Sequence, residues 1–208
     1  MVEAGVIYTA SENEGALRQG ELVSGLIQAR RRLDSIGPGQ APVVQLVTHP
    51  WAMVMSQDCD LDWDFRARQG EPRGTGTEEP SPAKEIPDTL LCMALEAERL
   101  RARPQINSRD WDRMKINKDE RYQFLQRVAP GEDLLGEGVP ELCIDFKRYF
   151  TIPTDELNLQ LALGARRRCR LNMPYGQHLA ARFFFFQCRI ALPQEHFSEP
   201  ASTGRVAS

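Results

Sequence analysis

The sequence predicts a mainly β protein with two helices, built as a small antiparallel barrel or strongly bent sheet with a helical insertion and a C-terminal helix. Short segments rich in β-branched and apolar residues are separated by glycine, proline and asparagine turn signals, which is typical of antiparallel strands. The segment 141–152 alternates apolar and polar side chains, which indicates a strand with one buried face. The chain lacks the βαβ alternation that would indicate a parallel sheet.

Three strands are expected in the first third of the chain. Segment 20–28 is the first, and segments 43–47 and 51–56 follow it. His49-Pro50 separates the last two, and because proline has no N–H to donate to a ladder, we expect a bend or break there. Arg30, Arg31 and Arg32 are expected in the connection between the first and second strands.

The middle of the chain is expected to contain a loop, the inserted helix and two strands. Segment 69–87 is rich in glycine and proline and has too few apolar residues to offset ordering entropy, so it is expected to be a flexible surface loop. Asp88 is a good N-cap for a helix that runs to Arg101, with leucines and alanines on a wide apolar face. Strands are expected at 121–128 and 141–152.

The last third of the chain is expected to form a hairpin and the C-terminal helix. Leucines alternate with other residues from Leu157 to Leu163, which predicts a strand, and 166–173 is its expected hairpin partner. Pro174 is suited to the first turn of a helix, which the run Phe183–Phe186 makes apolar almost all round. The sequence predicts one domain over 1–193, with a loosely ordered tail at 194–208.

Composition places the chain among ordinary globular proteins. It has 208 residues, of which 41% are hydrophobic and 26% charged, and its formal net charge of −3 gives no general attraction to nucleic acid or anionic membranes. The five cysteines are odd in number and lack a Cys-x-x-Cys pair, which favours reduced thiols. We expect a cytoplasmic protein with no signal peptide, no membrane span and no cofactor.

An unusual acidic segment, Ser56-Gln-Asp-Cys-Asp-Leu-Asp-Trp-Asp64, is the first candidate site. In an extended chain Asp58, Asp60, Asp62 and Asp64 would lie along one edge. Three interpretations are open: a solvated strand end or loop, a hard-cation site for which Asp58 and Asp60 are the candidate ligands, and a docking edge for a basic partner or for the protein's own arginines. Neighbouring carboxylates suppress a thiolate, so Cys59 is expected to be structural and to point into the barrel.

A basic cluster near the C-terminus is the second candidate site. Arg166, Arg168 and Arg170 would share one face of a strand, and with His49 they are candidate phosphate contacts. The same pattern also describes a solvated strand, or a strand that pairs with the acidic edge. Phosphate-loop, dinucleotide-binding, Gly-x-Ser-x-Gly and His-Glu-x-x-His signatures do not occur in the sequence, which counts against the common enzyme classes.

The order Gly20-Glu-Leu-Val, a basic connection and His49-Pro-Trp-Ala-Met-Val-Met-Ser56 resembles the opening of MazF/PemK-type small barrels. The resemblance implies an SH3-like barrel, and the toxin members of that family cut RNA without metal. Their second strand usually begins with Arg-Pro, whose arginine takes part in cleavage, whereas His49 stands at that position here. The segment Ser-Gln-Asp-Cys-Asp-Leu, with the late Arg-Ile-Ala-Leu-Pro, also resembles uncharacterised bacterial proteins.

These observations lead to one functional hypothesis and two alternatives. The hypothesis is a non-catalytic interaction module, an accessory subunit of a larger bacterial assembly that binds a protein partner through the acidic edge and the aromatic C-terminal helix. The first alternative is a nucleic-acid-binding or RNA-cleaving protein with His49, Arg166 and Arg168 near the substrate. The second is a metal-dependent hydrolase that uses Asp58 and Asp60.

Overall fold

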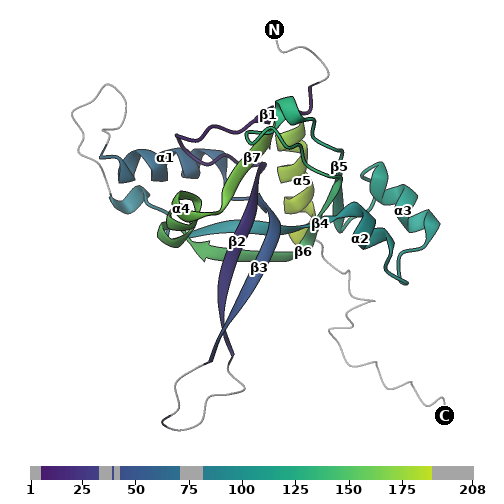
Figure 1. The fold of residues 1–208 in the computed structure, drawn as a ribbon, viewed down its shortest axis with the longest axis horizontal. Coiled ribbons are helices and arrows are strands. Elements are labelled where there is room, and N and C mark those ends of the chain that lie inside the picture. Colours follow the sequence, from purple (N-terminus) through teal and green to yellow (C-terminus); the bar gives the residue numbers. More distant parts are fainter. Residues whose placement is uncertain (1–5, 33–38, 40–42, 71–81, 189–208) are drawn as a thin grey trace, which may run out of the picture.

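The computed structural model describes residues 6–32, 39, 43–70 and 82–188, which form a mixed β and α protein around a seven-stranded antiparallel sheet (Figure 1). The strand order is β1-β7-β2-β3-β4-β6-β5. The strands are β1 (Tyr8–Ala10), β2 (Glu21–Arg32), β3 (Val43–Val54), β4 (Asp88–Glu96), β5 (Tyr122–Leu125), β6 (Leu142–Pro153) and β7 (Arg166–Leu171). The helices are α1 (Asp58–Arg68), α2 (Ala97–Arg101), α3 (Ser108–Lys115), α4 (Thr154–Leu163) and α5 (Tyr175–Gln187), with 3₁₀ turns η2 (Pro82–Lys84) and η3 (Pro130–Glu132).

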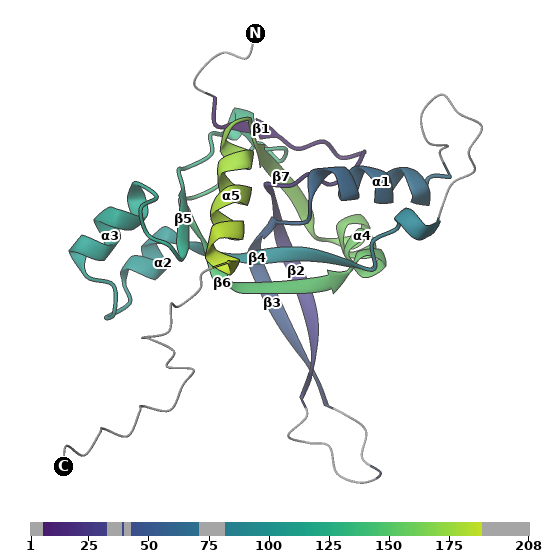
Figure 2. The same ribbon diagram turned by 180° about the vertical axis from the view of Figure 1, so that it is seen from behind.

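The sheet is bent but, over the residues that the structure describes, it is not a closed barrel. Its order runs from β1 at one edge to β5 at the other. β3 and β4 pair over a short stretch only, from Ala52–Met93 to Val54–Leu91, and the strands on either side of this joint run in steeply different directions (Figures 1 and 2). The helices α4 and α5 pack against the sheet and bury its apolar side chains. The expected SH3-like barrel is therefore not confirmed.

The expectation of two helices is wrong, since the described part of the chain holds five α-helices. Most of 88–101, expected to be one helix, is the strand β4, and only Ala97–Arg101 is helical. β4 lies between β3 and β6, and Leu91 and Cys92 are both buried because both faces of the strand are covered. Such a strand shows no alternation, and periodicity alone does not distinguish it from a buried helix.

The leucine-rich segment expected to be a strand is the helix α4. Residues at i and i+2 share one face of a strand, but the same spacing contains the i, i+4 pair Leu157 and Leu161, which shares one face of a helix. Leu157 is fully buried and Leu161 half-buried, whereas Leu163 is exposed. Asp155 and Glu156 lie in the first turn, where acidic side chains favour a helix. β7 consequently pairs with β1 and β2 rather than in a hairpin.

β2 and β3 form a hairpin of two 12-residue strands, and β3 continues through Pro50. Arg30, Arg31 and Arg32 belong to β2 rather than to a connection. Pro50 lies where β3 pairs with β2 alone, an edge position that proline tolerates. Gly25, opposite Pro50, has φ +77°, which favours glycine. Beyond this point the two strands project from the body as a ribbon (Figure 1).

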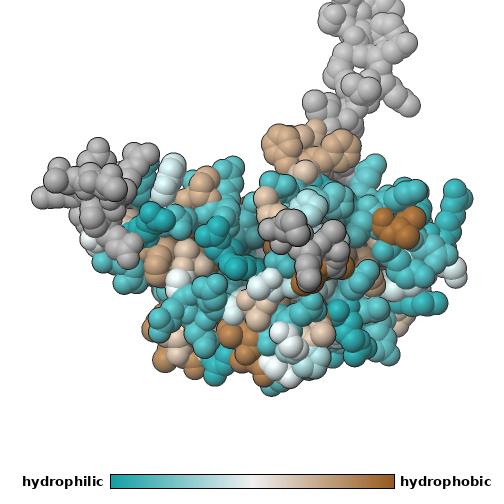
Figure 3. All heavy atoms as spheres, turned by 90° about the horizontal axis from the view of Figure 1, so that it is seen from above, coloured by the Kyte–Doolittle hydropathy of each residue, from teal (hydrophilic) through white to brown (hydrophobic). Residues whose placement is uncertain are grey.

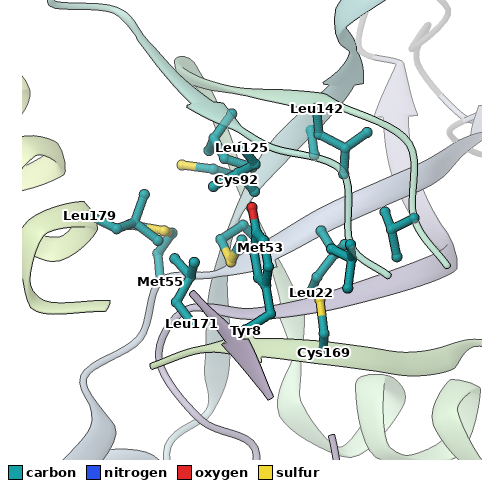
Figure 4. Close-up of a cluster of buried hydrophobic side chains, with 14 of the residues drawn as sticks. Tyr8, Leu22, Met53, Met55, Cys92, Leu125, Leu142, Cys169, Leu171 and Leu179 are labelled. Carbon is teal, nitrogen blue, oxygen red and sulfur yellow. The ribbon is translucent and has the colours of Figure 1, made fainter. Parts of the chain in front are cut away.

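Three hydrophobic cores hold the fold. The α5 core lies between the sheet and α5, and in Figure 4 side chains from β1, β2, β3, β7 and α5 converge on it. The α4 core is closed by Leu61 of α1 and Leu157 of α4. The α3 core joins α2, α3 and β5, with Trp111 edge-on to Phe124. β6 is present in all three, because its alternation is interrupted between Ile144 and Tyr149.

Other expectations have mixed outcomes. The strands at 141–152 and 166–173 and the C-terminal helix are confirmed, as β6, β7 and α5. Of the expected loop 69–87, residues 71–81 lie outside the described residues, and residues 82–84 form η2. The tail 194–208 also lies outside them. Within the described part of the chain, no helix has the length and apolar character needed to cross a bilayer.

Candidate functional site

The acidic segment forms the helix α1, so its four carboxylates do not lie along one edge. The alternating aspartates suggested an extended chain with a period of two residues. The segment also contains acid and arginine pairs at i, i+4, a spacing that suits a helix. Arg66 contacts Asp62 at 3.1 Å, and Arg68 contacts Asp64 at 2.9 Å. Acids in the first turn and arginines in the last turn both complement the helix dipole.

The protein's own arginines bind three of the four carboxylates. Asp58 forms an ion pair with Arg18 and accepts a hydrogen bond from the backbone N–H of Gln19 at 3.1 Å. Asp64 is buried, accepts from Arg68 and also accepts from the backbone N–H of Ile86 at 2.8 Å. Asp62 lies 3.8 Å from Arg18 as well as near Arg66. These pairs fasten α1 to the segments before and after it.

Asp60 differs from its neighbours. Within the described residues it has no arginine or lysine at ion-pair distance, and the Cys59 thiol lies 3.7 Å from its Oδ1. No group of three or more His, Cys, Asp or Glu side chains in the described part of the chain is arranged to hold a metal ion. The hard-cation interpretation of Asp58 and Asp60 therefore gains no support from the geometry.

The basic candidates on β7 have three different environments. Arg168 is buried, donates to both oxygens of Asp133 at 2.8 and 2.7 Å, and lies 5.1 Å above the Trp51 ring. Arg170 is partly exposed and lies 3.6 Å from Glu12. Arg166 is exposed and donates to the carbonyl of Ala165 at 3.1 Å. A β-bulge between Leu22 and Val23 of the paired strand breaks the expected common face.

His49 is a buried side chain rather than a surface contact. Its ring stacks on Phe150, and its Nε2 lies 3.2 Å from Oε1 of Gln28. Burial, with a smaller contribution from the nearby Arg30 guanidinium, lowers the pKa of His49 to about 4. The structure does not bring His49 together with Arg168 and Arg170, and these basic residues do not pair with the acids of α1.

A groove lies beside the first turn of α1. In Figure 2 α1 and α5 stand on the same side of the sheet, and the ends of β3 and β4 form the floor between them. The groove encloses about 1150 Å³. Its lining residues come from the loop before β2, the β3–α1 connection, α1, the start of β4, and α5. They are Arg18, Gln19, Met55, Ser56, Gln57, Asp58, Cys59, Asp60, Asp62, Ile86, Asp88, Leu90, Ala180, Ala181, Phe183, Phe184 and Gln187.

The two walls of this groove have different chemistry. The α1 side carries carboxylates, to which Asp88 of β4 adds another, so four carboxylates face one guanidinium, that of Arg18. The α5 side is apolar, and Phe184 is 69% exposed. Figure 3, a view from above, shows hydrophobic patches that interrupt a largely hydrophilic surface. The fold thus unites the acidic segment and the aromatic helix, which lie more than a hundred residues apart in sequence.

Cys59 lies on the groove surface, contrary to the expectation that it points inward. Its thiol is exposed, 3.8 Å from Oε1 of Gln57 and 3.7 Å from Asp60, so no histidine is placed to activate it within the described residues. Sequence reasoning missed Asp88 as a groove residue, because it was expected to be a helix N-cap. The arrangement offers charge and apolar surface in one groove.

Comparison with known proteins gives no match: no family model, curated protein or solved structure is similar to this chain.

Proposed function

We propose that this protein is a non-catalytic docking module, whose groove between α1 and α5 binds a basic, partly apolar segment of a partner protein. The observation that carries the proposal is that one groove has an acidic wall and an apolar wall. The acidic wall contains Asp58, Asp60 and Asp88, and the apolar wall contains Phe183 and Phe184. A bound segment would place cationic side chains against the first wall and apolar ones against the second.

The size and electrostatics of the groove support a peptide segment as its occupant. Pockets for small molecules usually measure about 300–1000 Å³ and enclose most of the ligand, whereas this groove is open and exceeds that range. An excess of carboxylates attracts cationic partners and repels phosphate backbones. Asp60 and Asp88 can meet a partner without breaking an ion pair to another described residue, unlike Asp58, which binds Arg18.

A labelled peptide tests the proposal directly. The probe is a fluorescein-labelled decapeptide of alternating arginine and leucine, and its control replaces every arginine with glutamate. Fluorescence anisotropy should report salt-sensitive binding of the first peptide and none of the second. The double variant Asp60→Lys/Asp88→Lys should weaken binding at least about tenfold, equivalent to about 1.4 kcal/mol. Phe184→Ala should also weaken it.

The matched control is Glu98→Lys. Glu98 is exposed on α2, away from the groove, and its reversal makes a single charge change of the same sign. Binding should survive in Glu98→Lys, and circular dichroism melting should confirm that every variant is folded. If the double groove variant binds the arginine–leucine peptide as tightly as the wild type does, the groove is not the docking site.

Nucleic-acid binding or RNA cleavage, with an SH3-like barrel as its scaffold, is the alternative proposal. Its support is the exposed arginines of the β2–β3 ribbon and Arg166 on β7. It predicts salt-sensitive binding of a fluorescein-labelled single-stranded RNA. A flat titration at low ionic strength would reject it.

A further inference from the structure

The β2–β3 hairpin has a projecting part with an exposed apolar face. We call residues 26–32 of β2 and 43–49 of β3 the arm. Cross-strand partners in an antiparallel pair lie on the same face, so the pairs Arg31–Val44, Ala29–Leu46 and Ile27–Thr48 together define one side of the arm. Val44 is 54% exposed and Leu46 is 68% exposed on this side. This side of the arm therefore offers apolar side chains beside the Arg31 guanidinium, which belongs to the outermost of these pairs.

The arm is fixed at its root. Gln160 of α4 accepts a hydrogen bond from the N–H of Ile27 at 2.8 Å and donates one to the Ile27 carbonyl at 2.7 Å. On the opposite strand, His49 stacks against Phe150 of β6. These contacts set the direction in which the ribbon leaves the body. In Figures 1 and 2 it points away from α1 and α5, so a molecule cannot reach its own groove with its own arm.

The arm and the groove are complementary in chemistry. The groove presents carboxylates beside the exposed Phe184 and the half-buried Phe183, and the arm presents Arg31 beside Val44 and Leu46. We propose that the partner segment is the arm of a second copy of this chain, whose Arg31 side docks in the α1–α5 groove. This inference rests on the proposed function. The arginine faces Asp60 and Asp88, while the apolar residues face Phe183 and Phe184.

A second copy fits the arm better than a nucleic acid does. Interfaces with nucleic acid are more polar and more positively charged than interfaces between proteins. On this side of the arm the most exposed apolar side chain is Leu46, which no phosphate backbone would cover. Since the arm of one molecule meets a different surface on the next, the contact is heterologous. Such contacts form rings or open chains rather than being limited to a pair.

Sedimentation velocity on the full chain tests the assembly over a dilution series. The wild type should form species larger than dimers as concentration rises. An arm variant, Arg31→Glu/Leu46→Gln, and a groove variant, Asp60→Lys/Asp88→Lys, should each stay monomeric. Mixed together, they should form a dimer that grows no further, because only one intact arm and one intact groove can meet.

Controls alter the same kinds of surface without touching the contact. Gln45→Glu changes the charge on the other side of the arm, where Gln45 pairs with Arg30. Glu98→Lys changes the charge on α2. Both should assemble as the wild type does. A wild type that is monomeric throughout overturns arm docking, whereas the arginine–leucine peptide still decides the proposed function. Assembly that survives the arm variant, or a monomer that binds duplex DNA through the arm, also overturns it.

Discussion

The imidazole of His49 lies parallel to the ring of Phe150, with centroids 3.9 Å apart and an interplanar angle of 9°. The contact joins β3 to β6 at the root of the arm, where the two strands are not hydrogen-bonded neighbours. His49 is fully buried, and its Nδ1 has no hydrogen-bond partner in the structure as described. A proton there would be buried without a counter-charge, so the ring is neutral in the folded protein near pH 7.

The first prediction concerns pH. The folded-state pKa of His49, about 4, lies below the unfolded value of 6.5, so the unfolded chain takes up the proton first as pH falls. This contribution to the free energy of unfolding is present above pH 6.5 and is lost as pH drops to about 4, by up to about 3 kcal/mol. Urea titrations across that window should find a flatter profile in His49→Leu than in wild type. His178→Leu, at an exposed position of α5, should keep the wild-type slope.

The second prediction separates two leucines that a strand would treat alike. Leu157 is fully buried and Leu163 is 76% exposed, so Leu157→Ala should lower the free energy of unfolding by about 2–5 kcal/mol. Leu163→Ala should change it by less than about 0.5 kcal/mol. Equal losses in chemical denaturation would mean that both side chains share a buried face, which contradicts a helix at α4.

The third prediction contrasts two arginines of β7. Arg168 and Asp133 are both buried, so Arg168→Ala leaves a carboxylate without its partner and should cost about 3–5 kcal/mol. Arg170 is partly exposed, and losing its 3.6 Å contact with Glu12 should cost at most about 1 kcal/mol. Thermal denaturation at low and high salt measures both. A mild Arg168→Ala would show that the Asp133 carboxylate finds another partner or water.

The fourth prediction concerns thiol reactivity. Cys59 and Cys188 are exposed, and Cys92, Cys143 and Cys169 are buried. Burial raises the pKa of Cys143 and Cys169 to about 12 and also raises that of Cys92, which suppresses their thiolates. Ellman's reagent should therefore modify the two exposed cysteines of the folded protein, and the other three only after denaturation.

The same reaction reports on the groove. In a Cys188→Ser background, the rapid signal should come from Cys59, which lines the groove. The arginine–leucine peptide should slow modification of Cys59, and its glutamate–leucine control should not. A reaction rate indifferent to both peptides would place the peptide elsewhere on the surface.

The sequence predicted best those elements whose pattern follows from local chemistry alone. Periodicity was enough to predict the strands β6 and β7. A proline signal and an apolar run were enough to predict the helix α5. α4 was mistaken for a strand and α1 for an extended segment, because every second residue was of one kind and i, i+2 repeats contain i, i+4 repeats. β4 was mistaken for a helix because both its faces are buried, which erases alternation.

Predicting the site needed contacts that sequence spacing does not encode. The acidic segment and the C-terminal helix were identified separately, but nothing local indicates that they line one groove or that Asp88 joins them. Arg18, which binds Asp58, lies 40 positions away along the chain. The fate of the β7 arginines depends on a β-bulge in the pairing of β7 with β2, where Leu22 faces Cys169 and Val23 faces Arg167, and Arg168 is a buried partner of Asp133 rather than a surface cation.

The strand β6 has a consequence for how the molecule unfolds. Phe146 belongs to the α5 core, Phe150 to the α4 core and Cys143 to the α3 core, so one strand contributes side chains to all three. If β6 detaches, each core is opened to water at once, and no core can persist as an independent unit. Heat should therefore melt the described body in a single cooperative transition, with calorimetric and van't Hoff enthalpies in agreement.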